Sequence, residues 1–333
     1  MDEKILIEIV SKYDISYTKI SKIIDSSRPD DYRLNIILDD NYVVRINNKN
    51  SITEERLSGI ERLICRYNEI GVNAPHYLKN IAGTYSIIID DKICYVSEYA
   101  NYALACDLEL EPYMLRKESI AHLGVLASKY TNYDLVETKS MWSIIDLAPL
   151  DIDIDEKQEN LNSLVEELTK IGQVELAIRI NEFNNVNRQK IINVFDQLPR
   201  CVYQGDLNDS NILIKDNKFY GLIDFNMSGT EVNINCFLSE TDRGILPGDF
   251  ENYSAKEILD NMINYQNELL KIVLKEYQLN DFEKEVFENY RNIILISQYP
   301  NVCSYIYYLD STYKESVLEL LRLIINRKKS ILC

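Results

Sequence analysis

Glycine, histidine and tryptophan are scarce in this chain. Its 333 residues include 10 glycines, none before Gly59, with two histidines and one tryptophan. The seven cysteines form no CxxC pair and only His76 and His122 accompany them, so the sequence indicates reduced structural thiols and no zinc cluster. The first 58 residues also exclude a glycine-rich phosphate loop, in which glycine lets the backbone approach phosphate closely.

Long apolar runs are absent as well. No window reaches 18 apolar residues without a charge, so the sequence predicts no membrane span. The first ten residues, MDEKILIEIV, lack the basic flank and the long apolar stretch of a signal peptide. We therefore expect a cytoplasmic protein.

The charge balance is strongly acidic. The formal net charge is −17, whereas the hydrophobic content of 46% and charged content of 27% are ordinary for a globular protein. Such a field repels phosphate backbones and anionic lipid, which disfavours nucleic acid and membrane partners and favours a cationic substrate. Acidity that serves only solubility is the alternative.

The first hundred residues read as a small sheet with one helix. Residues 32–38 and 42–46 flank a turn and predict a hairpin, and residues 85–89 and 93–96 predict a second one. Between the hairpins, Thr53 is a candidate N-cap for a helix that stops at Gly71.

Helical spacing dominates from about residue 103, interrupted by one β-rich island at residues 201–225. We expect an α+β, two-lobed chain, with a small β-rich lobe at residues 1–97 and a larger helical lobe at 98–333. The predicted helices lie near residues 112–130, 156–184, 186–197, 254–277, 280–297 and 313–327.

Three polar residues in the island carry the chemistry: Asp206, Asn211 and Asp224. Strand-like runs after Asn211 and before Asp224 surround a turn, and a hairpin there brings both residues to the same end of two paired strands. Phosphoryl transfer requires a carboxylate that accepts a proton and oxygen ligands that bind a metal ion. We expect Asp206 to orient the attacking hydroxyl and accept its proton, and Asn211 and Asp224 to hold Mg²⁺.

The block QGDLNDSNILI followed by GLIDF resembles the catalytic block of aminoglycoside phosphotransferases and choline kinases. The resemblance implies a two-lobed protein-kinase-like fold, with a nucleotide-binding lobe at residues 1–97 and a catalytic and substrate-binding lobe at 98–333. It also implies transfer of a nucleotide γ-phosphoryl group, from ATP or GTP, to a small molecule. Gln204 stands where that family has histidine, a residue that orients the loop, and its amide can also supply hydrogen bonds.

The same resemblance assigns residues in the first lobe. Arg45, on a central strand, takes the place of the phosphate-binding cation. Glu61 is the helix carboxylate expected to hold Arg45, with Glu54 and Glu55 as alternatives. Backbone groups of Ser97 and Tyr99 would bind the purine at the hinge between lobes.

Two further segments leave alternatives open. Ser26 and Ser27, in the turn at residues 25–30, either donate to phosphate or belong to an ordinary polar turn. In the stretch from Tyr299 to Tyr313, tyrosines either hold a quaternary ammonium or pack between helices.

The acceptor site is expected in the helical lobe. Glu231, Glu240 and Asp242 follow the metal-binding block and are preferred over the acidic group at residues 151–159, although an acidic run is often only a solvated face. We therefore expect an active Mg²⁺-dependent kinase with a cationic, aminoglycoside-like acceptor. The alternatives are a choline- or sugar-type kinase and a non-catalytic nucleotide- or partner-binding protein. A protein kinase is disfavoured because no Ala-Pro-Glu segment follows Asp224.

Overall fold

A computed structural model describes residues 3–48 and 52–327. The chain divides into two compact units. Unit 1 comprises Met1–Leu115 with Asp206–Asn226, and unit 2 comprises Arg116–Gly205 with Met227–Cys333. Residues 206–226 thus group with the first part of the chain, and the lobe boundary expected between residues 97 and 98 stays a prediction.

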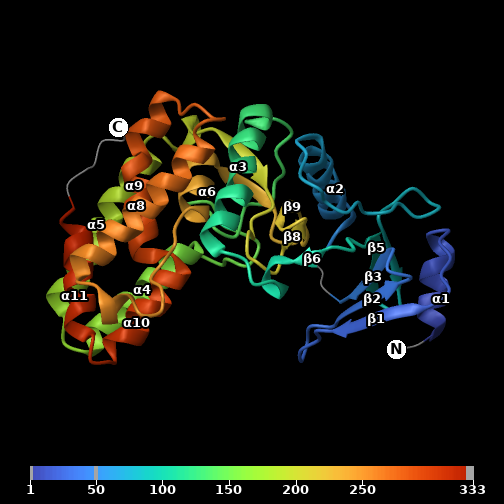
Figure 1. Cartoon of the computed structure of the whole chain (residues 1–333), viewed down its shortest axis with the longest axis horizontal. Coiled ribbons are helices and arrows are strands. Elements are labelled where there is room, and N and C mark those ends of the chain that lie inside the picture. The colour runs from blue at the N-terminus through green and yellow to red at the C-terminus, as the bar shows by residue number, and fades with distance from the viewer. Residues whose placement is uncertain (1–2, 49–51, 328–333) are drawn as a thin grey trace. The chain divides into compact units, whose positions relative to one another are not determined.

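Unit 1 contains a five-stranded antiparallel sheet with the strand order β1-β2-β3-β5-β4 (Figure 1). Both predicted hairpins are present, and Asp39, Asp40, Asp90 and Asp91 form their turns with positive φ. Aspartate tolerates this left-handed conformation better than most residues. The strands are β1 (Ile20–Asp25), β2 (Arg33–Leu38), β3 (Tyr42–Asn47), β4 (Ser86–Ile89) and β5 (Lys92–Glu98).

The helix α1 (Glu3–Lys12), which the sequence reading missed, covers one face of this sheet. Its Leu6 and Ile9 are fully buried in a cluster with Val44 and Ile46 of β3. Because side chains alternate along a strand, Arg45 belongs to the opposite face. Arg45 lies there beside the buried Tyr95, its cross-strand partner on β5.

The predicted helix of unit 1 is α2 (Glu54–Glu69). Thr53 is its N-cap, as predicted, because its side chain accepts a hydrogen bond from the Arg56 N–H. Gly71 follows the helix with a φ of +84°. Apolar residues at helical spacing form the buried face of α2: Leu57, Ile60, Leu63, Ile64 and Tyr67.

A smaller three-stranded sheet with the order β6-β8-β9 completes unit 1, and it contains the predicted hairpin of the β-rich island. The strand β9 also accepts a loop after α2, since Asn73 N–H donates to Tyr220 O and Leu222 N–H donates to Asn73 O. A Cβ on Gly221 would lie 2.0 Å from Asn73 O, so the approach requires glycine. The elements are β6 (Ala103–Leu104), η1 (Ala105–Asp107), β8 (Ile212–Lys215) and β9 (Lys218–Leu222).

Unit 2 is mainly helical, with a two-stranded antiparallel ladder of β7 and β10. Within the described residues, no helix is long and apolar enough to cross a membrane. The elements are α3 (Pro112–Tyr130), which begins in unit 1, α4 (Glu156–Lys170), α5 (Val174–Ile192), η2 (Phe195–Gln197), β7 (Arg200–Tyr203), β10 (Gly229–Val232), α6 (Asn233–Glu240), α7 (Asp249–Asn252), α8 (Ala255–Val273), α9 (Asp281–Ser297), α10 (Tyr299–Leu309) and α11 (Lys314–Ile325).

Most helix predictions are confirmed in unit 2, but two are wrong. The predicted helix at 156–184 is two helices, α4 and α5, because Gly172 takes a φ of +83° between them. The helix predicted at 186–197 is the end of α5 followed by the short η2. The tyrosine-rich stretch contains α10, whose fully buried Tyr305 donates to Leu295 O, so this tyrosine packs between helices.

Candidate active site

The segment Asp206–Asn211 forms a loop in which Asp206 is held by two amides. Asn208 Nδ2 donates to Asp206 Oδ1 over 2.7 Å, and Asn211 Nδ2 donates to Asp206 Oδ2 over 2.8 Å. The Asp206 backbone carbonyl also accepts from the Asn208 N–H. These bonds fix the orientation of the carboxylate without neutralising it.

Asn211 and Asp224 lie at the same end of the β8–β9 hairpin, as predicted. Ile212 pairs with Leu222, and the adjoining Ile223 N–H donates to Asn211 O over 2.9 Å. Asp224 follows this bond with a φ of +56° and an exposed side chain. A non-glycine residue in this conformation stores backbone strain, which functional sites often contain.

The donor set fits a hard divalent cation such as Mg²⁺. Since the Asn211 nitrogen is committed to Asp206, its amide oxygen is the atom that remains for a metal. Together with the Asp224 carboxylate it supplies the oxygen ligands that Mg²⁺ prefers. Burial raises the pKa of Asp206, the bonds from Asn208 and Asn211 oppose that rise, and the charge of Asp224 adds to it.

The structure does not pair Arg45 with Glu61. Arg45 donates to the buried Ser97 hydroxyl over 2.5 Å, and its guanidinium lies 5.9 and 5.8 Å from the ring centres of Tyr77 and Tyr95. Glu61 instead accepts from the Tyr77 N–H over 2.8 Å. The expected ion pair is therefore absent from this conformation, and the nucleotide-binding roles of Arg45 and Glu61 stay predictions.

The two alternative carboxylates do not replace Glu61. Glu54 accepts from the backbone N–H groups of Tyr85 and Ser86 and from the Ser86 hydroxyl, which ties α2 to β4. Glu55 is exposed to solvent. Neither interaction involves Arg45, whose polar side-chain contact within the described residues is Ser97.

Ser97 and Tyr99, the residues predicted to form the hinge, make backbone contacts within unit 1. Ser97 pairs with Val43 across β5 and β3, and the Tyr99 N–H donates to Asn41 O over 2.8 Å. The Tyr99 donor proposed for a purine is thus engaged inside unit 1. Contacts of Ser97 and Tyr99 with a nucleotide stay predictions.

The phosphate-loop candidates belong to a closed turn. The Ser27 hydroxyl accepts from the Arg33 N–H over 3.0 Å, and the Ser26 N–H donates to Arg33 O. The Ser27 N–H is bound to Asp25 Oδ1. These bonds support the interpretation of an ordinary polar turn for Ser27.

In unit 2, Gln204 follows β7 with its side chain 2% exposed. The next residue, Gly205, has a φ of +79°, and a Cβ there would lie 2.7 Å from Met227 O. Both conditions require glycine at the position directly before Asp206. The buried place of Gln204 is consistent with a loop-orienting role, which stays a prediction.

Trp142 is a functional candidate that the sequence reading missed. Its indole Nε1–H donates to Gly205 O over 2.5 Å. The Trp142 carbonyl accepts from the buried Lys157 ammonium over 2.7 Å and from Asn235 Nδ2 over 2.9 Å. Trp142 thus connects a buried polar cluster to Gly205, the residue directly before Asp206. It is the only tryptophan in the chain, but no sequence motif marks it.

The three predicted acceptor carboxylates all have partners inside unit 2. Glu231 is buried, accepts from the Ser143 hydroxyl over 2.9 Å, and has a pKa raised by burial. Glu240 accepts from Arg116 over 2.9 Å. Asp242 accepts from Asn301 over 2.8 Å, and burial raises its pKa to about 6. Their binding of an acceptor stays a prediction, and Glu231 has the least exposure for it.

The other acidic group is partly structural. Asp155 caps α4 by accepting from the Gln158 N–H, and it forms a two-bond ion pair with Arg188 at 2.6 and 2.8 Å. Both side chains are largely buried. This pair anchors the start of α4 against α5.

The fold is the protein-kinase-like fold of small-molecule kinases. Solved structures that match nearly the whole chain include a microcompartment-associated aminopropanol kinase, with a TM-score of 0.56, 10% identity and coverage of 98% of both chains. An amicoumacin kinase, in complex with AMP-PNP and Ca²⁺, matches with a TM-score of 0.54, 13% identity and coverage of 98% of this chain and 94% of the other.

A spectinomycin phosphotransferase, in complex with ADP and spectinomycin, matches with a TM-score of 0.54, 11% identity and coverage of 97% and 98%. No protein-family model and no curated protein sequence matches the chain. The likeness to these structures confirms the fold that the sequence predicts, a β-rich sheet followed by a helical part.

Proposed function

We propose that the chain is a small-molecule kinase that transfers the γ-phosphoryl group of ATP or GTP to a hydroxyl group. The observation that carries the proposal is the arrangement of Asp206, Asn211 and Asp224 at one loop and one hairpin end. The fold shared with three small-molecule kinases supports the same reaction class.

In this reaction the acceptor oxygen forms a bond to the γ-phosphorus while the bond to the β–γ bridging oxygen breaks. Asp206 orients the acceptor hydroxyl and takes its proton, and Asn208 and Asn211 keep the carboxylate in place. Arg45 would bind phosphate oxygens. Asn211 and Asp224 would hold Mg²⁺, which offsets negative charge on the phosphates.

We propose a small acceptor with at least one amino group. The net charge of −17 favours a cation over an anionic or neutral acceptor. The matched structures of this fold include an aminopropanol kinase and a spectinomycin phosphotransferase bound to spectinomycin, and both of these small molecules carry amino groups. Choline-type and plain sugar acceptors are the alternatives.

The experiment compares two aspartates of the same loop. We expect Asp206→Asn to lower acceptor-dependent release of ADP or GDP by roughly 10²–10⁴-fold. Asp209→Asn makes the same charge change at an exposed residue of this loop. The Asp209 contact with the Cys106 N–H is made by its backbone oxygen and survives the substitution, so this variant should keep wild-type turnover. Equal rates for the two variants would remove Asp206 from the mechanism.

A second function is favoured by one observation, the absence of an Arg45–Glu61 pair. A kinase fold that binds a nucleotide or a partner without turnover needs no such pair. Isothermal titration with ATP and GTP, beside the turnover assay, separates the two: binding without turnover in the presence of amines and Mg²⁺ favours the non-catalytic function.

A further inference from the structure

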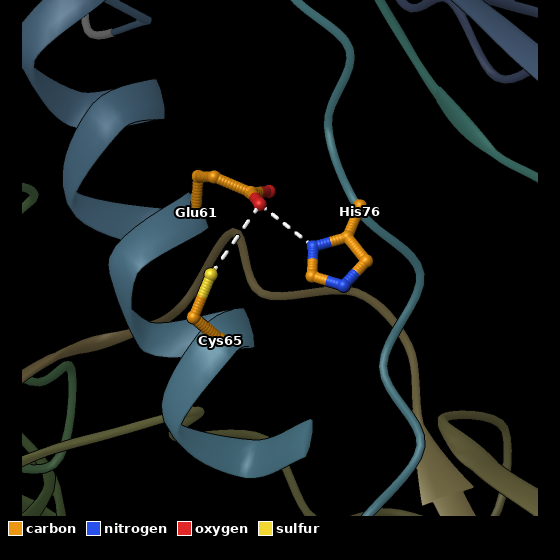
Figure 2. Close-up of side chains that lie close together, drawn as sticks. All are labelled: Glu61, Cys65 and His76. Carbon is orange, nitrogen blue, oxygen red and sulfur yellow. Dashed lines mark hydrogen bonds and ion pairs between the residues drawn. The ribbon is translucent and has the colours of Figure 1, made fainter. Parts of the chain in front are cut away.

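Three metal-ligating side chains meet on the α2 side of unit 1: Glu61, Cys65 and His76 (Figure 2). Glu61 and Cys65 are four residues apart in α2 and share a helix face, and His76 comes from the chain that follows the helix. One atom from each residue lies within 4.8 Å of the other two. The group is accessible to ions, because Cys65 is exposed and the His76 side chain is 42% exposed.

The distances suit a small tetrahedral ion after modest rearrangement. Zinc bound at its usual distances keeps thiolate sulfur and carboxylate oxygen about 3.6 Å apart, and nitrogen and oxygen about 3.3 Å apart. Cys65 Sγ lies 3.6 Å from Glu61 Oε1, and His76 Nδ1 lies 2.7 Å from the same oxygen. Insertion of an ion therefore leaves the first distance unchanged and widens the second by about half an ångström.

The surroundings orient the carboxylate for this purpose. The Tyr77 N–H donates to Glu61 Oε2 over 2.8 Å, which leaves Oε1 directed at Cys65 and His76. Such outer-shell bonds are typical of metal sites. A thiol, an imidazole and a carboxylate form a mixed sulfur, nitrogen and oxygen set, which suits Zn²⁺ and not Mg²⁺.

We propose that Glu61, Cys65 and His76 form a binding site for Zn²⁺ or a similar thiophilic divalent cation, with water as the fourth ligand. On binding, Cys65 loses its thiol proton to solvent. The bound ion would join α2 to the chain segment around His76 and stabilise unit 1 in proportion to its affinity. The sequence alone indicated no zinc cluster, because these ligands follow no short zinc motif.

Asn68 is the neighbour that we expect to influence the affinity of this site for the ion. The Asn68 amide is fixed by Ala74, whose O and N–H it binds at 2.9 and 3.0 Å, and its nitrogen faces His76 Nε2 at 3.1 Å. In the neutral imidazole these contacts favour the tautomer with its proton on Nδ1. An ion at Nδ1 moves that proton to Nε2, opposite a donor, which weakens binding.

The test measures metal binding directly and does not depend on kinase activity. Isothermal titration of the reduced wild-type chain with Zn²⁺ should show one site per chain. Titration with Co²⁺ should produce thiolate-to-cobalt charge transfer in the near ultraviolet. Cys65→Ser should abolish that band and weaken Zn²⁺ binding by more than the roughly 10–100-fold that loss of an outer-shell partner costs.

Cys106→Ser is the matched control, because Cys106 is also exposed and lies outside the group; it should bind Zn²⁺ like the wild type. Asn68→Ala should tighten binding, because it removes the donor that lies opposite His76 Nε2. Circular dichroism establishes that each variant is folded. Absence of a one-to-one site in the wild type, or equal Zn²⁺ affinity of Cys65→Ser and Cys106→Ser, would overturn the proposal.

Discussion

Gly205→Ala tests how the residue before the Asp206–Asn211 loop is held in place. Gly205 has a φ of +79°, which costs an alanine about 1–2 kcal/mol. The new Cβ would also lie 2.7 Å from Met227 O, so the backbone must shift, at a further cost of about 1–3 kcal/mol. Alanine also leaves the unfolded chain less conformational freedom than glycine does, which offsets about 0.4–1 kcal/mol of this loss. We expect the free energy of unfolding to fall by about 2–4 kcal/mol.

Gly172→Ala is the control for backbone conformation alone. Gly172 has a φ of +83° and nothing within 4 Å of its added Cβ, and it lies in the same unit. We expect this variant to lose only about 1 kcal/mol. Urea denaturation followed by far-ultraviolet circular dichroism measures both. If Gly205→Ala is no less stable than Gly172→Ala, the close approach to Met227 does not constrain the loop.

Three other variants have defined outcomes. Trp142→Phe removes the bond to Gly205 O, so hydrogen exchange in the peptide spanning residues 201–211 should quicken while circular dichroism stays unchanged; unchanged exchange would contradict the support role. Burial raises the pKa of Glu283 from 4.5 to about 7, so the folded state binds the extra proton and wild-type stability falls as pH rises between these values. Glutamine stays neutral, so the free energy of unfolding of Glu283→Gln, measured by urea denaturation, should rise by about 2–3 kcal/mol relative to the wild type from pH 4.5 to about 7. A difference between the two proteins that does not change with pH would refute this. Arg188→Met leaves Asp155 buried without its cation and should cost about 3–5 kcal/mol in the same assay; a loss below about 1 kcal/mol would show that the pair is not needed.

The elements that the sequence predicted well are those with strong local signals. The hairpins of the first sheet follow from strand-like runs around paired aspartates, which accept positive φ. Thr53 as an N-cap and the apolar stripe of α2 are similarly local. Apolar periodicity does not reveal where a long helix breaks, so the single predicted helix at 156–184 concealed the turn at Gly172.

The candidate site was predictable only in part. Asp206, Asn211 and Asp224 lie on one loop and one hairpin, so their spacing fixes their proximity. The partners of Arg45 and Glu61 depend instead on side-chain rotamers and on competition among several neighbouring polar groups. No sequence spacing identifies Ser97 as the partner of Arg45 or Tyr77 as the partner of Glu61. Sequence spacing also does not predict contacts between segments that are far apart in the chain. Trp142 reaches Gly205 from 63 positions away in the chain.

The chemical identity of the product decides whether the chain is a small-molecule kinase. Purified chain, Mg²⁺ and ATP or GTP are incubated with amino sugars, amino alcohols, choline-like amines and plain sugars, and the products are analysed by phosphorus NMR and mass spectrometry. We predict a phosphate ester on an acceptor hydroxyl, formed by the wild type and by Asp209→Asn and lost with Asp206→Asn. Intact nucleotide with every acceptor, or an ester that Asp206→Asn forms equally well, would contradict it.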